Sequence, residues 1–155
     1  MNDSEVRLIG LFFFFALLDD AKAIEAASQA TDLYQLKIKR KPDPNTNILI
    51  IQSTQAIWEK VKGRFQRGRP QYSADAGWIL PETLDMGPWK EFQKSAPEDE
   101  LLAVIWRLLL QIPEEDVSQA LGISSGTLRY RLGRALRKLG GFSQATPRRI
   151  DLVRS

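Results

Sequence analysis

The side chains best suited to chemistry in this chain are the cations of the segment SGTLRYRLGRALRKL, at positions 125–139. This segment contains five basic residues and no acidic one. An arginine can bind a guanine edge with two hydrogen bonds or hold a phosphate. Charge is also segregated along the chain, since residues 127–155 carry eight basic and one acidic side chain, and residues 81–116 carry three and nine. This distribution predicts a polyanionic partner, with a merely solvated helix face and tail as the alternative.

A helical projection of residues 125–139 separates an apolar face from a polar one. The apolar face carries Leu128, Leu132, Ala135, Leu136 and Leu139. The opposite face carries Thr127, Tyr130, Arg134 and Arg137, with Arg131 and Lys138 on one flank and Arg129 near the other edge of the apolar stripe. Residues of the first turns are expected to approach base edges, namely Ser125, Thr127, Arg129 and Tyr130. Later residues are expected to contact phosphates, namely Arg134, Arg137 and Lys138.

The residues before this helix predict how it is positioned. A short helix is expected over residues 113–121, because Pro113 suits the first helical position. Gly122 is expected to leave that helix in a left-handed conformation, and Ser124 is expected to cap the next helix. The pair Gly140 and Gly141 is expected to end that helix after residue 139. Two helices joined by a glycine turn, with the second one basic, are typical of a DNA-binding helix-turn-helix.

The whole pattern predicts an all-α chain of two small helical domains joined by a linker. Apolar spacing predicts helices over residues 4–18, 21–39 and 46–65, with a short strand as the alternative for residues 48–51. The second of these helices carries its apolar residues at Ala23, Ile24, Ala27, Leu33, Leu36 and Ile38. We assign residues 1–68 to an N-terminal domain, 69–94 to a linker, 95–141 to a helix-turn-helix domain and 142–155 to a basic tail. A short helix is expected in the linker near residues 89–93, with its apolar side chains packed on the chain's own core rather than on a partner.

The composition favours a binding protein over an enzyme. The chain contains no cysteine and no histidine. It therefore lacks thiolate metal ligands, the commonest general base and the commonest metal ligand. Since no acid–base pair, phosphate loop or metal set stands out either, we expect no enzymatic activity and no cofactor.

The apolar run LIGLFFFFALL at residues 8–18 is expected to form a buried helix. It is too short to span a bilayer as a helix. A signal peptide is the alternative, but acidic residues precede the run and no cleavage pattern follows it. We therefore expect a cytoplasmic protein without a membrane partner.

The segment PEDELLAVIWRLLLQIPEEDVSQALGISSGTLRYRLGRALRKLG resembles the C-terminal domain of bacterial sigma factors, especially the extracytoplasmic-function group. The signature is ALGIS-x-GTL-x-x-RL-x-RA-x-x-KL, at residues 120–139. In that family the domain binds the −35 element of promoters. The resemblance therefore implies that duplex promoter DNA is bound through Ser124, Ser125, Thr127, Arg129, Tyr130, Arg131, Arg134, Arg137 and Lys138.

The resemblance extends to residues 17–31, which read LLDDAKAIEAASQAT. They are similar to the sigma segment that contacts RNA polymerase core and begins the −10 recognition domain. This implies contacts to core polymerase by Asp20, Glu25 and Gln29. The chain has Ala26 and Ala30 at two positions where the family usually has an acid.

Three functions remain open at this stage. The first is a divergent sigma factor that binds both core polymerase and promoter DNA. The second is a sigma-like DNA-binding regulator without core binding. The third is an adaptor with a degenerate helix-turn-helix that docks a protein, such as a polymerase subunit or an anti-sigma factor.

Overall fold

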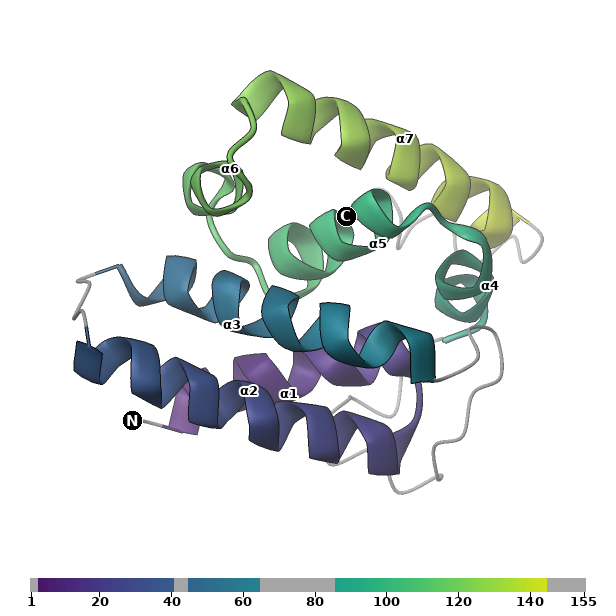
Figure 1. Cartoon of the computed structure of the whole chain (residues 1–155). Coiled ribbons are helices and arrows are strands. Elements are labelled where there is room, and N and C mark those ends of the chain that lie inside the picture. The colour runs from purple at the N-terminus through teal and green to yellow at the C-terminus, as the bar shows by residue number, and fades with distance from the viewer. Residues whose placement is uncertain (1–2, 41–44, 65–85, 145–155) are drawn as a thin grey trace.

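The computed structural model describes residues 3–40, 45–64 and 86–144, with side chains as far as Gly141. Within these ranges the chain forms seven α-helices and no β-strand (Figure 1), so the predicted all-α fold is confirmed. Most of the linker expected over residues 69–94 and most of the basic tail expected over residues 142–155 lie outside the described residues.

Helix α1 (Asp3–Leu17) supplies the apolar centre of the N-terminal half. Its four consecutive phenylalanines, residues 12–15, are all buried. The ring of Phe12 contacts that of Phe13 at a centroid distance of 4.9 Å and stacks on Trp106 at 5.4 Å. The apolar run is thus a buried helix, as predicted. None of the described helices combines the length and the hydropathy that crossing a membrane requires.

Helix α2 (Asp20–Arg40) packs on α1 and α3 (Figure 1). The carboxylate of Asp19 accepts the backbone N–H of Lys22 at 3.0 Å, which caps the helix. Its buried residues are Ala23, Ala26, Ala30 and Tyr34. Two of its larger apolar residues point outward, since Ile24 is 60% exposed and Leu36 is 43% exposed. Small residues face the core here because they let the backbones of adjacent helices approach closely.

Helix α3 (Thr46–Val61) contacts α1 and α2 on one side and α6 on the other, and the short 3-10 helix η1 (Lys62–Arg64) continues it. Its opening residues 48–51 are helical and buried, so the alternative of a short strand is wrong. The carboxylate of Asp116 in α6 accepts hydrogen bonds from the Asn45 and Asn47 amides at 2.7 and 3.0 Å. These bonds attach α6 to the start of α3.

Helix α4 (Gly87–Ser95) confirms the short helix expected at the end of the linker. Trp89 and Phe92 are buried, and the Trp89 Nε1–H donates to the Phe15 carbonyl at 3.0 Å. The Gln93 amide donates to the Ala16 carbonyl at 2.9 Å. These two donors satisfy carbonyls at the C-terminal end of α1, where helices lack backbone partners. The apolar residues of this segment therefore pack on the chain's own core.

The C-terminal half comprises α5 (Glu98–Val104), the π-helical turn η3 (Ile105–Leu109), α6 (Glu114–Leu121) and α7 (Ser125–Gln144). Helix α7 contacts α5 and α4 and forms one outer edge of the molecule (Figure 1). It continues through Gly140 and Gly141, so the prediction that these glycines end it is wrong. Glycine weakens a helix interior by only about 1 kcal/mol, which packing can offset. Leu136, expected on the apolar face, is exposed.

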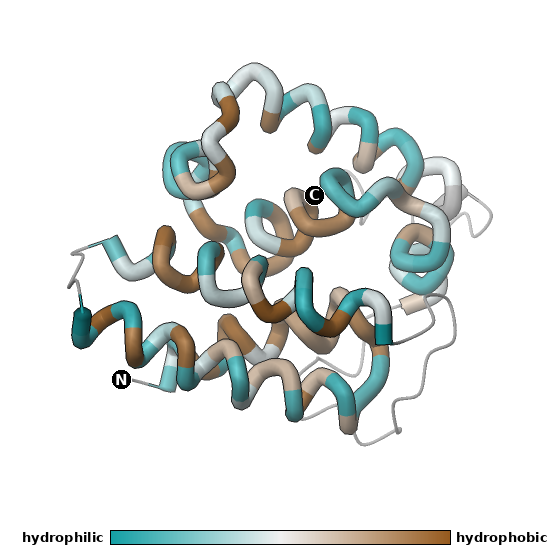
Figure 2. Tube along the Cα trace, viewed as in Figure 1, coloured by the Kyte–Doolittle hydropathy of each residue, from teal (hydrophilic) through white to brown (hydrophobic). Residues whose placement is uncertain are grey.

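The buried hydrophobic residues form one cluster that includes side chains from α1 through α7. Figure 2 shows hydrophobic residues gathered on α1, α3 and α5, in the middle of the molecule. The segments assigned to two domains from the sequence therefore share this core, and α7 is held in a fixed relation to the N-terminal helices.

Candidate nucleic-acid interface

The turn between α6 and α7 is built on a left-handed glycine, as the sequence predicts. Gly122 adopts φ 68° and ψ 33°, the left-handed conformation that glycine reaches without a Cβ penalty. The N–H groups of Gly122 and Ile123 donate to the carbonyls of Gln119 and Ser118 at 3.2 and 3.1 Å. Fully buried Val117 and Leu128 belong to the same core cluster as the rest of the motif. These contacts fix the direction in which α7 leaves the turn.

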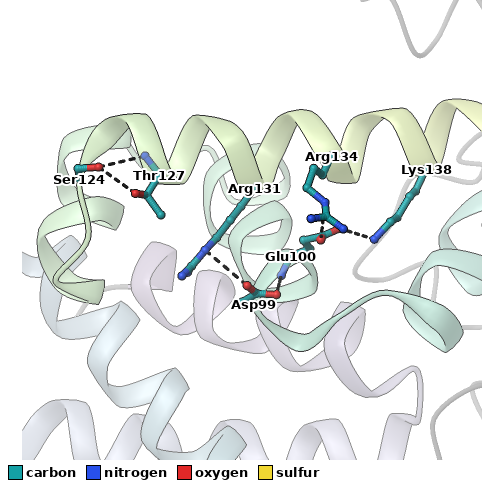
Figure 3. A network of polar contacts seen from close by, with 7 residues as sticks. All are labelled: Asp99, Glu100, Ser124, Thr127, Arg131, Arg134 and Lys138. Atoms are coloured by element: carbon teal, nitrogen blue, oxygen red, sulfur yellow. Dashed lines mark hydrogen bonds and ion pairs between the residues drawn. The ribbon is translucent and has the colours of Figure 1, made fainter.

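The start of α7 is capped by Ser124, as the sequence predicts. Its Oγ accepts the backbone N–H of Thr127 at 3.1 Å and donates to the Thr127 Oγ1 at 3.0 Å (Figure 3). Both side chains are exposed. The cap satisfies one of the N–H groups that a helix start leaves unpaired, and it holds two hydroxyls at the exposed end of α7.

One face of α7 is open to solvent. It carries Thr127, Tyr130 and Arg137, all exposed, with half-buried Ser125 beside them in the first turn. Tyr130 is 63% exposed, which is high for an aromatic side chain of this size. Among the described residues, Arg137 makes no ion pair. This face presents hydrogen-bonding groups and one cation outward, as a helix that enters a DNA groove requires.

The cations on one flank of α7 turn toward the first turn of α5. Lys138 Nζ lies 2.8 Å from Glu100 Oε1, and Arg134 Nε lies 3.5 Å from Glu100 Oε2. Arg131 Nε lies 3.5 Å from Asp99 Oδ2 (Figure 3). The sequence placed Arg134 on the open face, but its guanidinium also reaches this network. The Arg134 Cζ lies 5.8 Å from the centroid of the Tyr130 ring, so Arg134 lies between the open face of α7 and the flank that faces α5.

Arg129 lies at the other edge of α7. Its Nε is 2.6 Å from the Glu114 carboxylate at the start of α6, yet 70% of its side chain stays exposed. An ion pair this exposed is weak and can exchange partners readily. Arg129 therefore remains available to an outside anion.

Glu100 belongs to the ion-pair network on the flank of α7, although the sequence did not single it out. Acids in the first turn of a helix commonly serve only to complement the helix dipole. The side chain of Glu100 is instead 5% exposed and holds two cations of α7. Its neighbour Glu98 pairs with Lys62 at 3.1 Å, and although burial opposes it, the hydrogen bond from Lys62 leaves the pKa of Glu98 below its usual value. A signal was present in the sequence, since this turn holds three consecutive acids.

The residues implied to contact core polymerase all lie on α2, where Glu25 and Gln29, four residues apart, share a helix face. Half-buried Asp20 lines an apolar groove of about 610 Å³ between α1 and α2. Exposed Glu25 lines a smaller cleft of about 130 Å³ beside Lys22 and Arg64. Gln29 is half-buried and lines neither. Ala26 and Ala30 are buried, so an acid at either position would place a carboxylate in the core.

The groove between α1 and α2 is apolar at its walls and charged at its rim. Its walls include Val6, Gly10 and Phe14 of α1 and Ala23, Ile24 and Ala27 of α2. The charged groups around it are Asp3, Arg7, Asp20 and Asp32. Exposed Ile24 gives this surface an apolar side chain that a partner could cover.

Comparisons with protein-family models, curated proteins and solved structures found no match to the chain. Within the described part of the chain, no group of His, Cys, Asp or Glu side chains is arranged to hold a metal ion. The chemistry available at α6 and α7 is therefore that of hydrogen bonding and charge, supplied by hydroxyls, a phenol and guanidiniums.

Proposed function

We propose that this protein binds duplex DNA through α6 and α7, as a sigma-factor-like transcription initiation protein of the cytoplasm. The observation that carries the proposal is the solvent-facing side of α7, which begins at a capped end beyond a left-handed turn. Thr127, Tyr130 and Arg137 are exposed there, and none of them is needed to fill the core. A recognition helix needs such a face, because base edges are reached by side chains that project outward.

The positions of the cations support a division of roles along α7. Arg129 lies near the start of the helix, where base edges are expected, and keeps most of its side chain in solvent. Arg134 and Lys138 lie further along the helix on one flank, where the phosphate backbone is expected. Binding in this arrangement depends on phosphates for affinity and on the first two turns of α7 for sequence preference.

The test is direct binding of the full-length chain to duplexes enriched from a random-sequence library, measured by fluorescence anisotropy. Replacement of Arg129, Arg134 and Arg137 by alanine is expected to weaken binding at least about tenfold, since one good base contact contributes about 1–3 kcal/mol. The matched control replaces Lys37, Lys39 and Arg40 at the end of α2, which removes the same charge from a different helix. Equal affinity of the two triple variants would exclude α7 as the DNA-binding element.

A second function, docking of a protein partner, is favoured by the apolar groove between α1 and α2. Ile24 is 60% exposed on its wall, and an apolar groove of about 610 Å³ is large enough to receive side chains of a partner helix. The resemblance of residues 17–31 to bacterial sigma factors indicates RNA polymerase core as the partner. This docking and DNA binding by α7 use different faces of the molecule, so one chain can perform both.

Co-purification with RNA polymerase core at low salt tests this second function. Ile24→Arg is expected to abolish the association, because it places a cation in the apolar wall without disturbing a buried side chain. Leu36→Arg is the matched control, since Leu36 lies on the same helix, is 43% exposed and does not line the groove. Absence of the wild-type association would leave the protein a DNA-binding regulator, and association unaffected by Ile24→Arg would move the docking surface elsewhere.

A further inference from the structure

The cations on the flank of α7 are already paired inside the molecule. Arg131, Arg134 and Lys138 face two carboxylates of α5 at 2.8 to 3.5 Å (Figure 3). Asp99 Oδ1 accepts the backbone N–H of Glu100 at 2.9 Å, which orients its other oxygen toward Arg131. Three positive charges thus share two negative ones that belong to the same chain.

Glu100 is the buried centre of this network. A carboxylate with 5% of its side chain exposed is costly to bury unless it is paired and hydrogen-bonded. The side chains of Lys138 and Arg134 provide that pairing from successive turns of α7. The Glu100 carboxylate therefore holds both cations close to α5.

A DNA phosphate that approaches this flank meets cations whose charge is partly neutralised, with two carboxylates behind them. Like charges at this range repel, and the repulsion is weakly screened where one partner is buried. On the open face of α7, Arg137 makes no ion pair among the described residues, and Arg129, which is expected at base edges, pairs with Glu114 but keeps 70% of its side chain exposed. Asp99 and the buried Glu100 therefore act mainly on the flank where phosphate contacts are expected.

We propose that Asp99 and Glu100 are specificity-determining residues. They lower the affinity of α7 for any duplex, so a larger share of the remaining binding free energy depends on the base sequence. The proposal rests on the proposed function, DNA binding by α7. On one flank of α7, the carboxylates of Asp99 and Glu100 pair with the cations that a DNA phosphate would otherwise contact. Sequence-independent binding comes almost entirely from phosphate contacts, so it is the component that they suppress.

The experiment compares the wild-type chain with Glu100→Gln and Asp99→Asn in anisotropy titrations over a series of salt concentrations. The probes are a fluorescein-labelled 20-base-pair duplex of random sequence and a duplex enriched by the wild-type protein. Each variant is expected to bind the random duplex about tenfold more tightly. The slope of the logarithm of affinity against the logarithm of salt concentration is expected to steepen by the amount that about one phosphate contact contributes. The ratio of affinities for the enriched and random duplexes is expected to fall.

Glu98→Gln is the matched control. It removes the same charge from the same turn of α5, but its partner is Lys62 and not a residue of α7. A gain shared by Glu98→Gln would reflect net charge alone and overturn the proposal. Asp99, with 52% of its side chain exposed, can be changed without burying an unpaired group, so it keeps the test valid if Glu100→Gln destabilises the fold.

The outcomes separate this inference from the function on which it rests. Wild-type binding with no gain in either variant would overturn the role of Asp99 and Glu100 and leave DNA binding intact. Weaker binding by Asp99→Asn would overturn it too, because that result means that the acid positions Arg131 for phosphate. If neither the wild type nor any variant bound a duplex, the proposed function itself would fail.

Discussion

The indole of Trp106 in η3 donates a hydrogen bond from Nε1 to the Oγ1 of Thr54 in α3 at 3.0 Å, in the middle of the core. The Thr54 hydroxyl in turn lies 2.8 Å from the Ile50 carbonyl, so it can donate there while it accepts from the indole. The same indole stacks on Phe12 of α1. One side chain from the C-terminal half is thus bound by both α1 and α3, which is why the two halves share a core.

Thr54→Val is expected to destabilise the protein by about 1–3 kcal/mol, because it leaves the buried Trp106 N–H without an acceptor. Thr54→Ser keeps the hydroxyl and loses one methyl group, at a cost of about 1 kcal/mol. Urea unfolding followed by tryptophan fluorescence and by far-ultraviolet circular dichroism measures both. The two signals are expected to give one shared transition, since the halves unfold together. Equal stability of the two variants would contradict the role of this hydrogen bond.

The order of the helices that were expected follows from the sequence, but the end of α7 and the buried face of α2 do not. Hydropathy favours Ile24 and Leu36 over alanine, and the helical period alone allows either face to point inward. The structure instead buries Ala26, Ala30 and Tyr34, on the side of α2 that packs against α1 and α3. That choice depends on a neighbouring helix, so no pattern within α2 could predict it.

The candidate site shows the same limit. Gly122 and Ser124 were predictable, because a left-handed turn and a helix cap are decided by residues next to one another in the chain. Pairing of Lys138 with Glu100 spans 38 residues and depends on how α5 packs against α7. A helical projection places Lys138 on a flank but cannot say what lies beneath that flank.

The ion pair between Lys62 and Glu98 predicts how stability depends on pH. The hydrogen bonds that Lys62 donates to Glu59 and Glu98 raise the pKa of Lys62, and despite burial the bond from Lys62 keeps the pKa of Glu98 below its ordinary value. A carboxyl with a lowered pKa stabilises the fold above its unfolded pKa, and this stabilisation is lost as pH falls through the folded value. The urea concentration at the unfolding midpoint of the wild type is therefore expected to decrease as the pH is lowered below about 4.5.

The same measurement on Glu98→Gln isolates that pair. The variant is expected to show a shallower loss of stability on acidification than the wild type, because it has no carboxyl to protonate at this position. Glu91→Gln is a suitable control, since its exposed carboxylate belongs to α4 and not to this pair. Parallel acid profiles for the wild type and Glu98→Gln would show that the pair contributes nothing.

The Ser124 cap allows stability and DNA binding to be separated. Ser124→Ala is expected to cost about 1 kcal/mol, because it leaves the Thr127 N–H without its acceptor. Ser124→Asp keeps a capping oxygen and should retain near wild-type stability, while its negative charge weakens binding to a duplex. Thermal unfolding and anisotropy together measure the two effects. Unchanged DNA affinity in Ser124→Asp would place Ser124 outside the interface.

Two glycines of the motif are expected to respond to alanine with opposite signs. A Cβ on either Gly122 or Gly140 would meet no atom within 4 Å, so crowding does not affect the comparison. Gly122 has φ 68°, where an L-residue is strained, and Gly122→Ala is expected to destabilise the protein by about 1–2 kcal/mol. Gly140 lies inside α7, where alanine restricts the unfolded chain and favours the helix, so Gly140→Ala is expected to stabilise by about 0.5–1 kcal/mol. If the helix instead ended at residue 139 with Gly140 in a left-handed cap, both substitutions would destabilise, and thermal unfolding of the two variants distinguishes these cases.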